Sequence, residues 1–330
     1  MTNYKIVQHK NIWLAVSGAM FVIAAAALIF WGLKFGIDFT GGSLVEVKFN
    51  GNRPGVEEVN AKLADMNLGS LTVQPVGEEG MILRFQDTSK EKEEEVMKKL
   101  NELTGADKAE ANSGLVVTDE SGNPVDPSGI GVQLAGENSV EQVRYTSVGP
   151  SIGQELKRKS AYAIFWVFAA IVIYISVTFR RVSKPVSSWK YGVSALFTML
   201  HDVVITLGIF AFLGHFYGME INTPFVAAIL TVVGYSIHDT IVVFDRIREN
   251  LPRSDEDFSG TINASLNQTL VRSVNTTLTS LLSLVAVIIF GGESIRGFAL
   301  ALAIGIFIGT YSSIFVASPM LVLWEKWRRA

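Results

Sequence analysis

Apolar residues in this chain gather into six long runs. A helix crosses the roughly 30 Å hydrocarbon core of a bilayer in about 20 residues, because each residue adds about 1.5 Å. The runs approach or exceed this length and cover residues 12–33, 161–179, 191–213, 223–244, 273–290 and 297–324. Hydrophobic residues make up 49% of the chain, and the mean hydropathy is +0.34. The pattern predicts a polytopic α-helical membrane protein with six transmembrane helices.

The first run shares features with a secretory signal peptide. It follows Lys5, His9 and Lys10, and Ala25-x-Ala27 imitates a cleavage site. The apolar run is nevertheless longer than the roughly 7–15 residues typical of a signal sequence. We therefore expect an uncleaved anchor helix.

Basic residues are distributed unevenly among the short loops. Lys and Arg concentrate in cytoplasmic loops of membrane proteins. Six spans place both termini, the loop 180–190 and the loop after the fourth run on one side, and these segments are basic. The alternate loops, 214–222 and 291–296, contain a single Lys or Arg residue, Arg296. We predict a multi-pass protein of the cell (inner) membrane with both termini cytoplasmic.

Residues 34–157, between the first two runs, differ from the rest in charge. They hold 21 acidic and 12 basic residues, whereas the remainder holds 10 acidic and 16 basic residues, within a net charge of −3. Such asymmetry indicates two environments, and the acidity argues against nucleic-acid binding. The charge of the loops places this block outside the cytoplasm.

The external block has the pattern of a small α+β domain. Strand-like alternation and helical spacing follow one another in the order β-α-β-β-α-β, which is typical of a ferredoxin-like fold. The segments are 43–49, 56–66, 71–76, 81–85, 89–103 and 140–148. Residues 105–139, rich in Gly, Asp, Asn and Ser, are interpreted as a mobile insertion. The predicted organisation is 1–33 (cytoplasmic N-terminus and first helix), 34–157 (external domain), 158–324 (five-helix bundle) and 325–330 (cytoplasmic tail).

Asp239 is an ionisable residue within the fourth apolar run. It precedes Arg246 by seven residues, which places it about 10 Å below the membrane boundary. Charged groups at that depth cost a few kcal/mol and usually have a function. We predict that Asp239 carries a coupling proton; a hydrogen bond to a neighbouring helix is the structural alternative.

The predicted fifth helix carries a polar stripe at three- and four-residue intervals, which begins at Gln268, before the fifth apolar run. Its members are Gln268, Arg272, Asn275, Thr276, Thr279 and Ser283. The hydroxyls are also explained by interhelical hydrogen bonding, and Arg272 alternatively reaches the membrane interface through its long side chain. Because a guanidinium stays charged and needs an acceptor, we predict that Arg272 and Asp239 form a proton-relay pair.

Four further residues are candidates for ion coupling. Asp202 is either a second relay residue or a packing partner. His238 is a candidate proton shuttle because imidazole as a group titrates near neutrality, but its side chain points about 100° away from Asp239 around the helix, which favours polar packing. Asp245 and Arg246 have the pattern of an interfacial charge cluster.

Signals of an enzyme are missing from the sequence. The chain has no Cys, which excludes disulfides and thiolate metal sites, and its four His show no zinc spacing. We expect no catalysis, cofactor or metal. The series Ala301, Gly305 and Gly309 has the small-xxx-small spacing of a close helix–helix contact.

Three motifs carry a family resemblance. Residues 35–42 (FGIDFTGG), 148–156 (VGPSIGQEL) and 233–250 (VGYSIHDTIVVFDRIREN) are similar, in order, to the signatures of the SecF family, which belongs to the resistance-nodulation-division superfamily. The signature positions that we interpret as structural are Gly36, Asp38, Gly41, Gly42, Gly149, Pro150 and Gly153. The glycines allow positive φ and close approach where helix meets sheet.

The resemblance implies an accessory subunit of the Sec export machinery. Such a subunit pairs with SecD in a twelve-helix unit, associates with the SecYEG channel and contacts unfolded preproteins transiently. It couples the proton-motive force, or in some relatives another ion such as sodium, to late translocation steps, and the family's intramembrane Asp and Arg match Asp239 and Arg272. His238 departs from the Asn that is common before that Asp. The alternatives are half of a small-molecule or lipid exporter of the same superfamily, and a membrane-anchored receptor or chaperone without transport.

Overall fold

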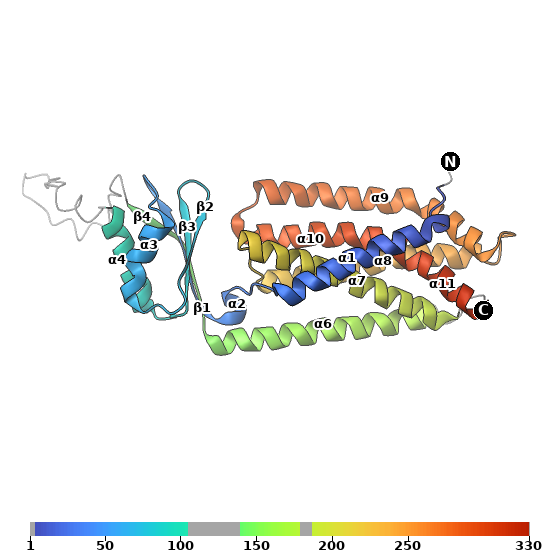
Figure 1. The fold of residues 1–330 in the computed structure, drawn as a ribbon, viewed down its shortest axis with the longest axis horizontal. Coiled ribbons are helices and arrows are strands. Elements are labelled where there is room, and N and C mark those ends of the chain that lie inside the picture. The colour runs from blue at the N-terminus through green and yellow to red at the C-terminus, as the bar shows by residue number, and fades with distance from the viewer. Residues whose placement is uncertain (1–3, 105–138, 179–186, 330) are drawn as a thin grey trace, which may run out of the picture. The chain divides into compact units, whose positions relative to one another are not determined.

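The chain forms two compact units in a computed structural model that describes residues 4–104, 139–178 and 187–329 (Figure 1). One unit is Ile37–Leu156, and the other combines Met1–Gly36 with Lys157–Ala330. The predicted insertion at 105–139 lies outside the described residues, apart from Ser139.

The second unit is a bundle of long helices, and it confirms the six predicted spans. Six helical segments of the described residues are long and apolar enough to cross a membrane, namely Val7–Phe30, Pro150–Thr178, Trp189–Tyr217, Thr223–Asn250, Phe258–Phe290 and Ile295–Lys326. Their elements are α1 (Lys10–Phe30), α6 (Pro150–Thr178), α7 (Ser188–Tyr217), α8 (Thr223–Asn250), α9 (Phe258–Phe290), α10 (Glu293–Ser312) and α11 (Ser318–Arg329).

Helix α9 begins well before residue 273, where the apolar run predicted its start. Hydroxyl residues interrupt the apolar pattern in its first half, but Thr261, Ser265 and Thr269 fit a helix because each bonds a carbonyl one turn back. Ser265 Oγ donates to Thr261 O at 2.8 Å, and Thr269 Oγ1 donates to Ser265 O at 3.1 Å. Asp257 caps the helix by accepting a hydrogen bond from Gly260 N at 2.8 Å. The predicted boundary was therefore wrong.

The sixth span contains a local irregularity that the sequence did not reveal. A π-helical turn, Ser313–Ala317, separates α10 from α11. Ser318 Oγ donates to Ser313 O at 3.3 Å within this turn. Such turns are rare and occur frequently at functional sites.

Helices α8 and α10 pack closely at the centre of the bundle. A Cβ on Gly305 would collide with Val232, and one on Gly309 would lie 2.9 Å from Ser236 Cβ. Ala301 is fully buried. The predicted small-residue contact is confirmed, whereas α6 and α9 leave most of their surfaces uncovered by the rest of the chain.

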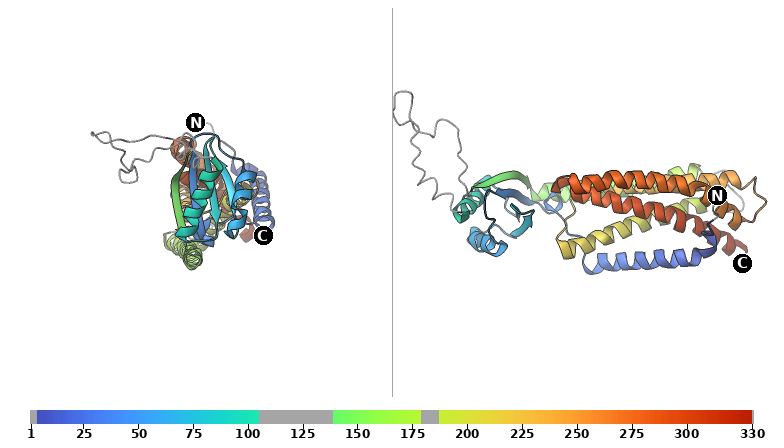
Figure 2. Two further views of the ribbon diagram at one scale, coloured as in Figure 1. Left: turned by 90° about the vertical axis from the view of Figure 1, so that its left-hand side faces the viewer. Right: turned by 90° about the horizontal axis from the view of Figure 1, so that it is seen from above.

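The first unit is a four-stranded antiparallel sheet with two helices. Its elements are β1 (Gly42–Phe49), α3 (Val56–Leu63), β2 (Thr72–Val76), β3 (Gly80–Phe85), α4 (Lys90–Thr104) and β4 (Val140–Val148). The strand order is β2-β3-β1-β4, which confirms the ferredoxin-like prediction. In the left view of Figure 2 both helices lie against one face of the sheet.

Alternation along β1 builds the core of this unit. Val45, Val47 and Phe49 are buried on the face that α3 and α4 cover, where Val59 and Val96 pack against them. Successive strand residues point to opposite faces, so every second position enters the core. Burial of each such side chain contributes about 1.5–3 kcal/mol.

Two of the family-like motifs contact each other at the base of this unit. Gly41 and Gly42 have φ of 76° and 122°. A Cβ on Gly41 would lie 2.7 Å from Pro150 Cα, and one on Gly153 would lie 3.0 Å from Phe39 O. Glycine at these positions permits both the backbone conformation and the close approach.

Candidate functional site

Asp239 lies buried on the inner face of α8, with 4% of its surface exposed. Ser273 of α9 donates to its Oδ1 at 3.3 Å, and the Thr310 hydroxyl of α10 lies close to the same carboxyl. Its Oδ2 is buried and has no hydrogen-bond partner among the described residues. A buried carboxyl oxygen without a partner costs free energy, so its retention points to function.

Arg272, predicted to pair with Asp239, lies on the exposed face of α9. The two side chains form no ion pair in the described structure. Ser273 faces Asp239 instead, because neighbouring helix residues point about 100° apart. The residues of the predicted polar stripe on α9 are exposed together with Arg272, and Gln268 at its start accepts a hydrogen bond from Asn250 of α8 at 3.0 Å.

The remaining candidates on α8 lie outside the buried cluster. His238 is exposed although it adjoins Asp239 in sequence. At the end of the helix Arg246 pairs with Glu249 at 2.9 Å, and Asp245 lies 3.8 Å from Arg248. These two pairs have the geometry of an exposed charge cluster.

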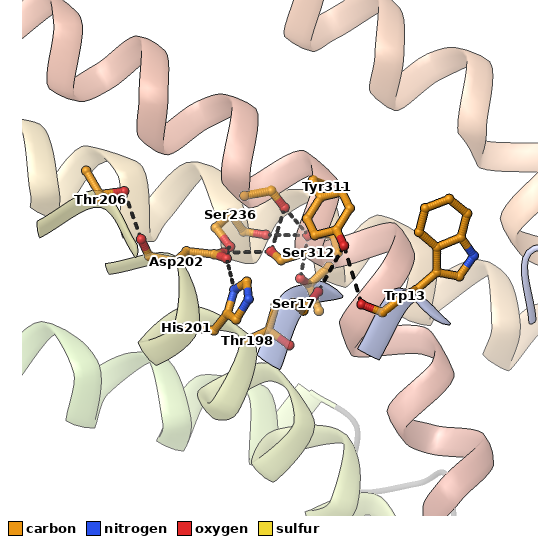
Figure 3. A network of polar contacts seen from close by, with 12 residues as sticks. Trp13, Ser17, Thr198, His201, Asp202, Thr206, Ser236, Tyr311 and Ser312 are labelled. Carbon is orange, nitrogen blue, oxygen red and sulfur yellow. Dashed lines mark hydrogen bonds and ion pairs between the residues drawn. The ribbon is translucent and has the colours of Figure 1, made fainter. Parts of the chain in front are cut away.

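Asp202 is the centre of a second buried polar cluster, shown in Figure 3. Its Oδ2 accepts hydrogen bonds from Ser236 of α8 at 2.5 Å and from Ser312 of α10 at 2.8 Å. Its Oδ1 lies 3.0 Å from Nδ1 of His201. Asp202 thus ties three helices together within the bundle.

Hydroxyl groups connect the neighbourhoods of the two carboxyls. Ser236 and Asp239 lie three residues apart on α8 and are both buried. Ser313, in the π-helical turn, shares a hydrogen bond of 2.8 Å with Thr240 and donates to Ser236 O at 3.2 Å. On the other side of Asp239, Thr310 shares a hydrogen bond of 2.6 Å with Thr277.

Several members of this site were not predicted from the sequence. They are Ser236, Ser273, Thr277, Thr310, Ser312 and Ser313. Hydroxyls are common in membrane helices, so none stands out alone. The available signal was spacing, because Ser236 precedes Asp239 by three residues and Thr310, Ser312 and Ser313 cluster in one turn.

The site suits proton chemistry. No group of three or more His, Cys, Asp or Glu arranged to hold a metal ion occurs in the described parts of the chain. Each of the two buried carboxyls is surrounded by hydroxyls that both donate and accept, and carboxyls and imidazoles are groups that bind and release protons.

The fold and site define a polytopic membrane protein with a buried acidic cluster and one ferredoxin-like domain between its first and second spans. Residues 132–327 match the family model described as "Protein export membrane protein SecD/SecF, C-terminal". Residues 27–52 match the "SecD/SecF GG Motif". The chain belongs to the SecD/SecF family.

Relatives within this family cover nearly the whole chain. The protein translocase subunit SecF of Thermobaculum terrenum is 40% identical over 97% of this chain and 94% of the relative. Protein translocase subunit SecDF of Brucella abortus is 33% identical over 98% of this chain, which corresponds to 37% of that longer protein. These names do not favour the small-molecule or lipid exporter alternative.

A solved structure shares the fold. The crystal structure of SecDF, a translocon-associated membrane protein from Thermus thermophilus, aligns with a TM-score of 0.78 and 29% identity. The alignment covers 98% of this chain and 39% of the SecDF chain.

Proposed function

We propose that this chain is the SecF-type subunit of a protein-export complex and couples ion flow to late steps of preprotein translocation. The observation that carries the proposal is Asp239, a carboxyl buried between α8, α9 and α10 with one oxygen unpartnered in the described structure. Membership of the SecD/SecF family indicates protein export as the process. The buried carboxyl of Asp239 is the proposed binding group for the coupling ion.

The exposed polar stripe of α9 supports a membrane partner of the SecD type. An Arg that faces lipid near mid-membrane costs a few kcal/mol, and Arg272 lies on this exposed face. A second helical subunit that covers α9 would give the guanidinium an acceptor, whereas the hydroxyls of Thr276, Thr279 and Ser283 already donate to carbonyls of α9. The SecDF relatives, in which a similar region forms part of one longer chain, support this pairing, which would form the proposed twelve-helix unit.

In the proposed mechanism Asp239 alternates between protonated and ionised forms. Ionisation strengthens its hydrogen bonds with donors such as Ser273, because bonds to charged acceptors are stronger. Protonation weakens them and favours a different packing of α8 against α9 and α10. Each proton that crosses the membrane supplies about 2.3 kcal/mol per 100 mV, which is enough to bias two packings.

The ferredoxin-like unit is the proposed outer element of this cycle. The basic loops predict that it lies outside the cytoplasm, on the side where exported chains emerge from SecYEG. Its motion would then assist the release of preproteins transiently bound there. Protons are the proposed coupling ion, since a lone carboxyl with hydroxyl neighbours binds a proton without a coordination shell.

The proposal is tested by export of a slow-folding secreted substrate into vesicles that contain SecYEG, this chain and its SecD partner. Asp239→Asn keeps the shape of the side chain but cannot carry a negative charge. We expect the variant to assemble and to lose the gradient-dependent part of export, with the basal part retained. Replacement of the proton gradient by a sodium gradient identifies the ion.

Asp255→Asn is the matched control, because Asp255 lies exposed in the segment between α8 and α9. It removes one carboxylate without touching the bundle. Full gradient dependence in Asp239→Asn would show that Asp239 is structural and would favour a chain without a transport role.

A further inference from the structure

His201 and Asp202 form a buried pair on α7 that the proposed role of Asp239 does not use. The side chains are 2% and 1% exposed, and Nδ1 and Oδ1 are 3.0 Å apart. Phe21 of α1 stacks on the imidazole with ring centroids 6.3 Å apart. His201 Nε2 is buried without a hydrogen-bond partner in the described structure.

The charge of this pair follows from its surroundings. A neutral imidazole beside an ionised carboxylate leaves one net negative charge in the bundle. Such a charge is far costlier to bury than a neutral pair. One additional proton, held as imidazolium–carboxylate or as imidazole–carboxylic acid, removes it. Of the side chains labelled in Figure 3, only His201, Asp202 and Tyr311 are titratable, and Tyr311 is engaged with Ser17 of α1 at 3.0 Å.

The hydroxyls around Asp202 accommodate both protonation states. Ser312 donates to Asp202 Oδ2 at 2.8 Å, and it also has the carbonyl of Gly309 as an acceptor at 3.0 Å. A hydroxyl has one proton and two acceptor positions. When the carboxyl of Asp202 takes up a proton, Ser312 can donate to the carbonyl of Gly309 and accept from Asp202. No polar group then loses its hydrogen-bond partner.

A connection to Asp239 runs through α8. Ser236 donates to Asp202 Oδ2 at 2.5 Å, and Asp239 lies one turn further along the same buried face. Residues three apart on a helix are neighbours. The contacts that other helices make with the pair come from Phe21 of α1, Ser236 of α8 and Ser312 of α10.

A polar face also leads from the pair towards the start of α7. Ser194 and Thr198 are buried at helical spacing before His201, and Thr198 Oγ1 donates to Ser194 O at 2.8 Å. Beyond Thr206 the next buried side chains of α7 are apolar, Phe210 and Ala211. Buried polar side chains on α7 thus extend from the pair to Ser194 in one direction and only to Thr206 in the other.

We propose that His201 and Asp202 together store one exchangeable proton and pass its effect to Asp239 through Ser236. The inference deepens the proposed function and rests on Asp239 being the coupling carboxyl. His201 is assigned as the group that shares the proton with Asp202, and Ser236 as a positioning residue between the two carboxyls.

Histidine nitrogen NMR and carboxyl infrared spectroscopy test the stored proton on the full chain with its SecD partner in lipid. The chain has only four His, and His201→Gln identifies the signal of His201. Near neutral pH we expect either a His201 imidazolium or a protonated carboxyl band that Asp202→Asn removes, and we expect it to disappear at high pH. Absence of both forms, or a signal that does not titrate, would overturn the proposal.

The link to Asp239 is tested by a double-variant comparison in the same spectra. Asp239→Asn should shift the pH at which the His201–Asp202 proton leaves, and Ser236→Ala should abolish that shift. Thr231→Ala is the control, since its exposed hydroxyl donates to Ala227 O of its own helix at 2.8 Å. Equal shifts with and without Ser236 would disprove the role of Ser236.

Spectroscopy and export separate the two proposals. If Asp239→Asn retains gradient-dependent export while His201 and Asp202 still hold a titrating proton, the coupling role of Asp239 fails and the buried proton store stands. If the pair holds no proton while Asp239→Asn abolishes coupling, only the inference about His201 and Asp202 fails.

Discussion

Glycine residues of α10 determine how closely α8 and α10 approach. At Gly305 the two helices touch so tightly that a Cβ would meet both methyl groups of Val232. At Gly309 the neighbour is Ser236, which also bonds Asp202. The buried acidic site therefore depends on residues that have no polar side chain themselves.

Gly305→Ala is predicted to destabilise the bundle. The added methyl group enters a packed interface, and overpacking of this kind costs about 1–3 kcal/mol. A lower midpoint of thermal unfolding in detergent is the expected result. Gly297→Ala on the same helix is the control, because nothing lies within 4 Å of a Cβ there, and equal midpoints for the two variants would contradict the prediction.

At the scale of elements, ion pairs join α4 to α3 and to the 3-10 turn Ala64–Met66 that follows α3. Lys99 of α4 donates to Asp65 Oδ1 in this turn at 2.6 Å, and Lys62 of α3 pairs with Glu102 of α4 at 2.9 Å. The hydrogen bond from Lys99 holds the pKa of Asp65 below its ordinary value. Because this pKa is lowered in the folded state, the contribution to stability is present above the unfolded pKa of about 3.9. It is lost as pH falls through the folded value.

Lys99→Met is predicted to raise the pKa of Asp65 towards its ordinary value. The variant removes the hydrogen bond that is the largest cause of the lowered pKa. Carboxyl NMR titration of the labelled chain, with Asp65→Asn for assignment, measures the change. Lys98→Met is the control, since Lys98 is exposed and is not among the partners of Asp65. An unchanged pKa in Lys99→Met would show that the pair is not formed in solution.

The position of Arg272 was harder to predict than the existence of its helix. The apolar run located α9, but a polar stripe predicts an inward face as readily as a face towards another subunit. The structure shows that Ser273 and Thr277 face inward, and that Arg272 is exposed. Periodicity gives the angle between residues and not the side on which the neighbours lie.

At the scale of the whole molecule, the basic loops predict one orientation in the membrane. The chain has no Cys, so single cysteines are introduced into an unmodified background. Glu79 lies exposed in the turn between β2 and β3, and Asp255 lies exposed between α8 and α9. With an impermeant thiol reagent, Glu79→Cys should react only from outside the cell and Asp255→Cys only after the cytoplasmic side is opened. If both cysteines reacted from the same side of the membrane, the prediction of six spans would be contradicted, because three of these spans lie between the two positions. A reversed result would contradict the predicted orientation.

Length, hydropathy and alternation were enough to predict the six spans, the ferredoxin-like strand order and Asp239 as a buried acid. These properties follow from local periodicity and from the free-energy cost of placing a charged group in hydrocarbon. Both act on each segment separately. Tertiary structure alone decided that Ser273 and not Arg272 contacts Asp239, that Ser236 and Ser312 meet at Asp202, and that Ser313–Ala317 forms a π-helical turn. These contacts join residues of different helices, and the rotation and register of packed helices depend on every side chain at their interface.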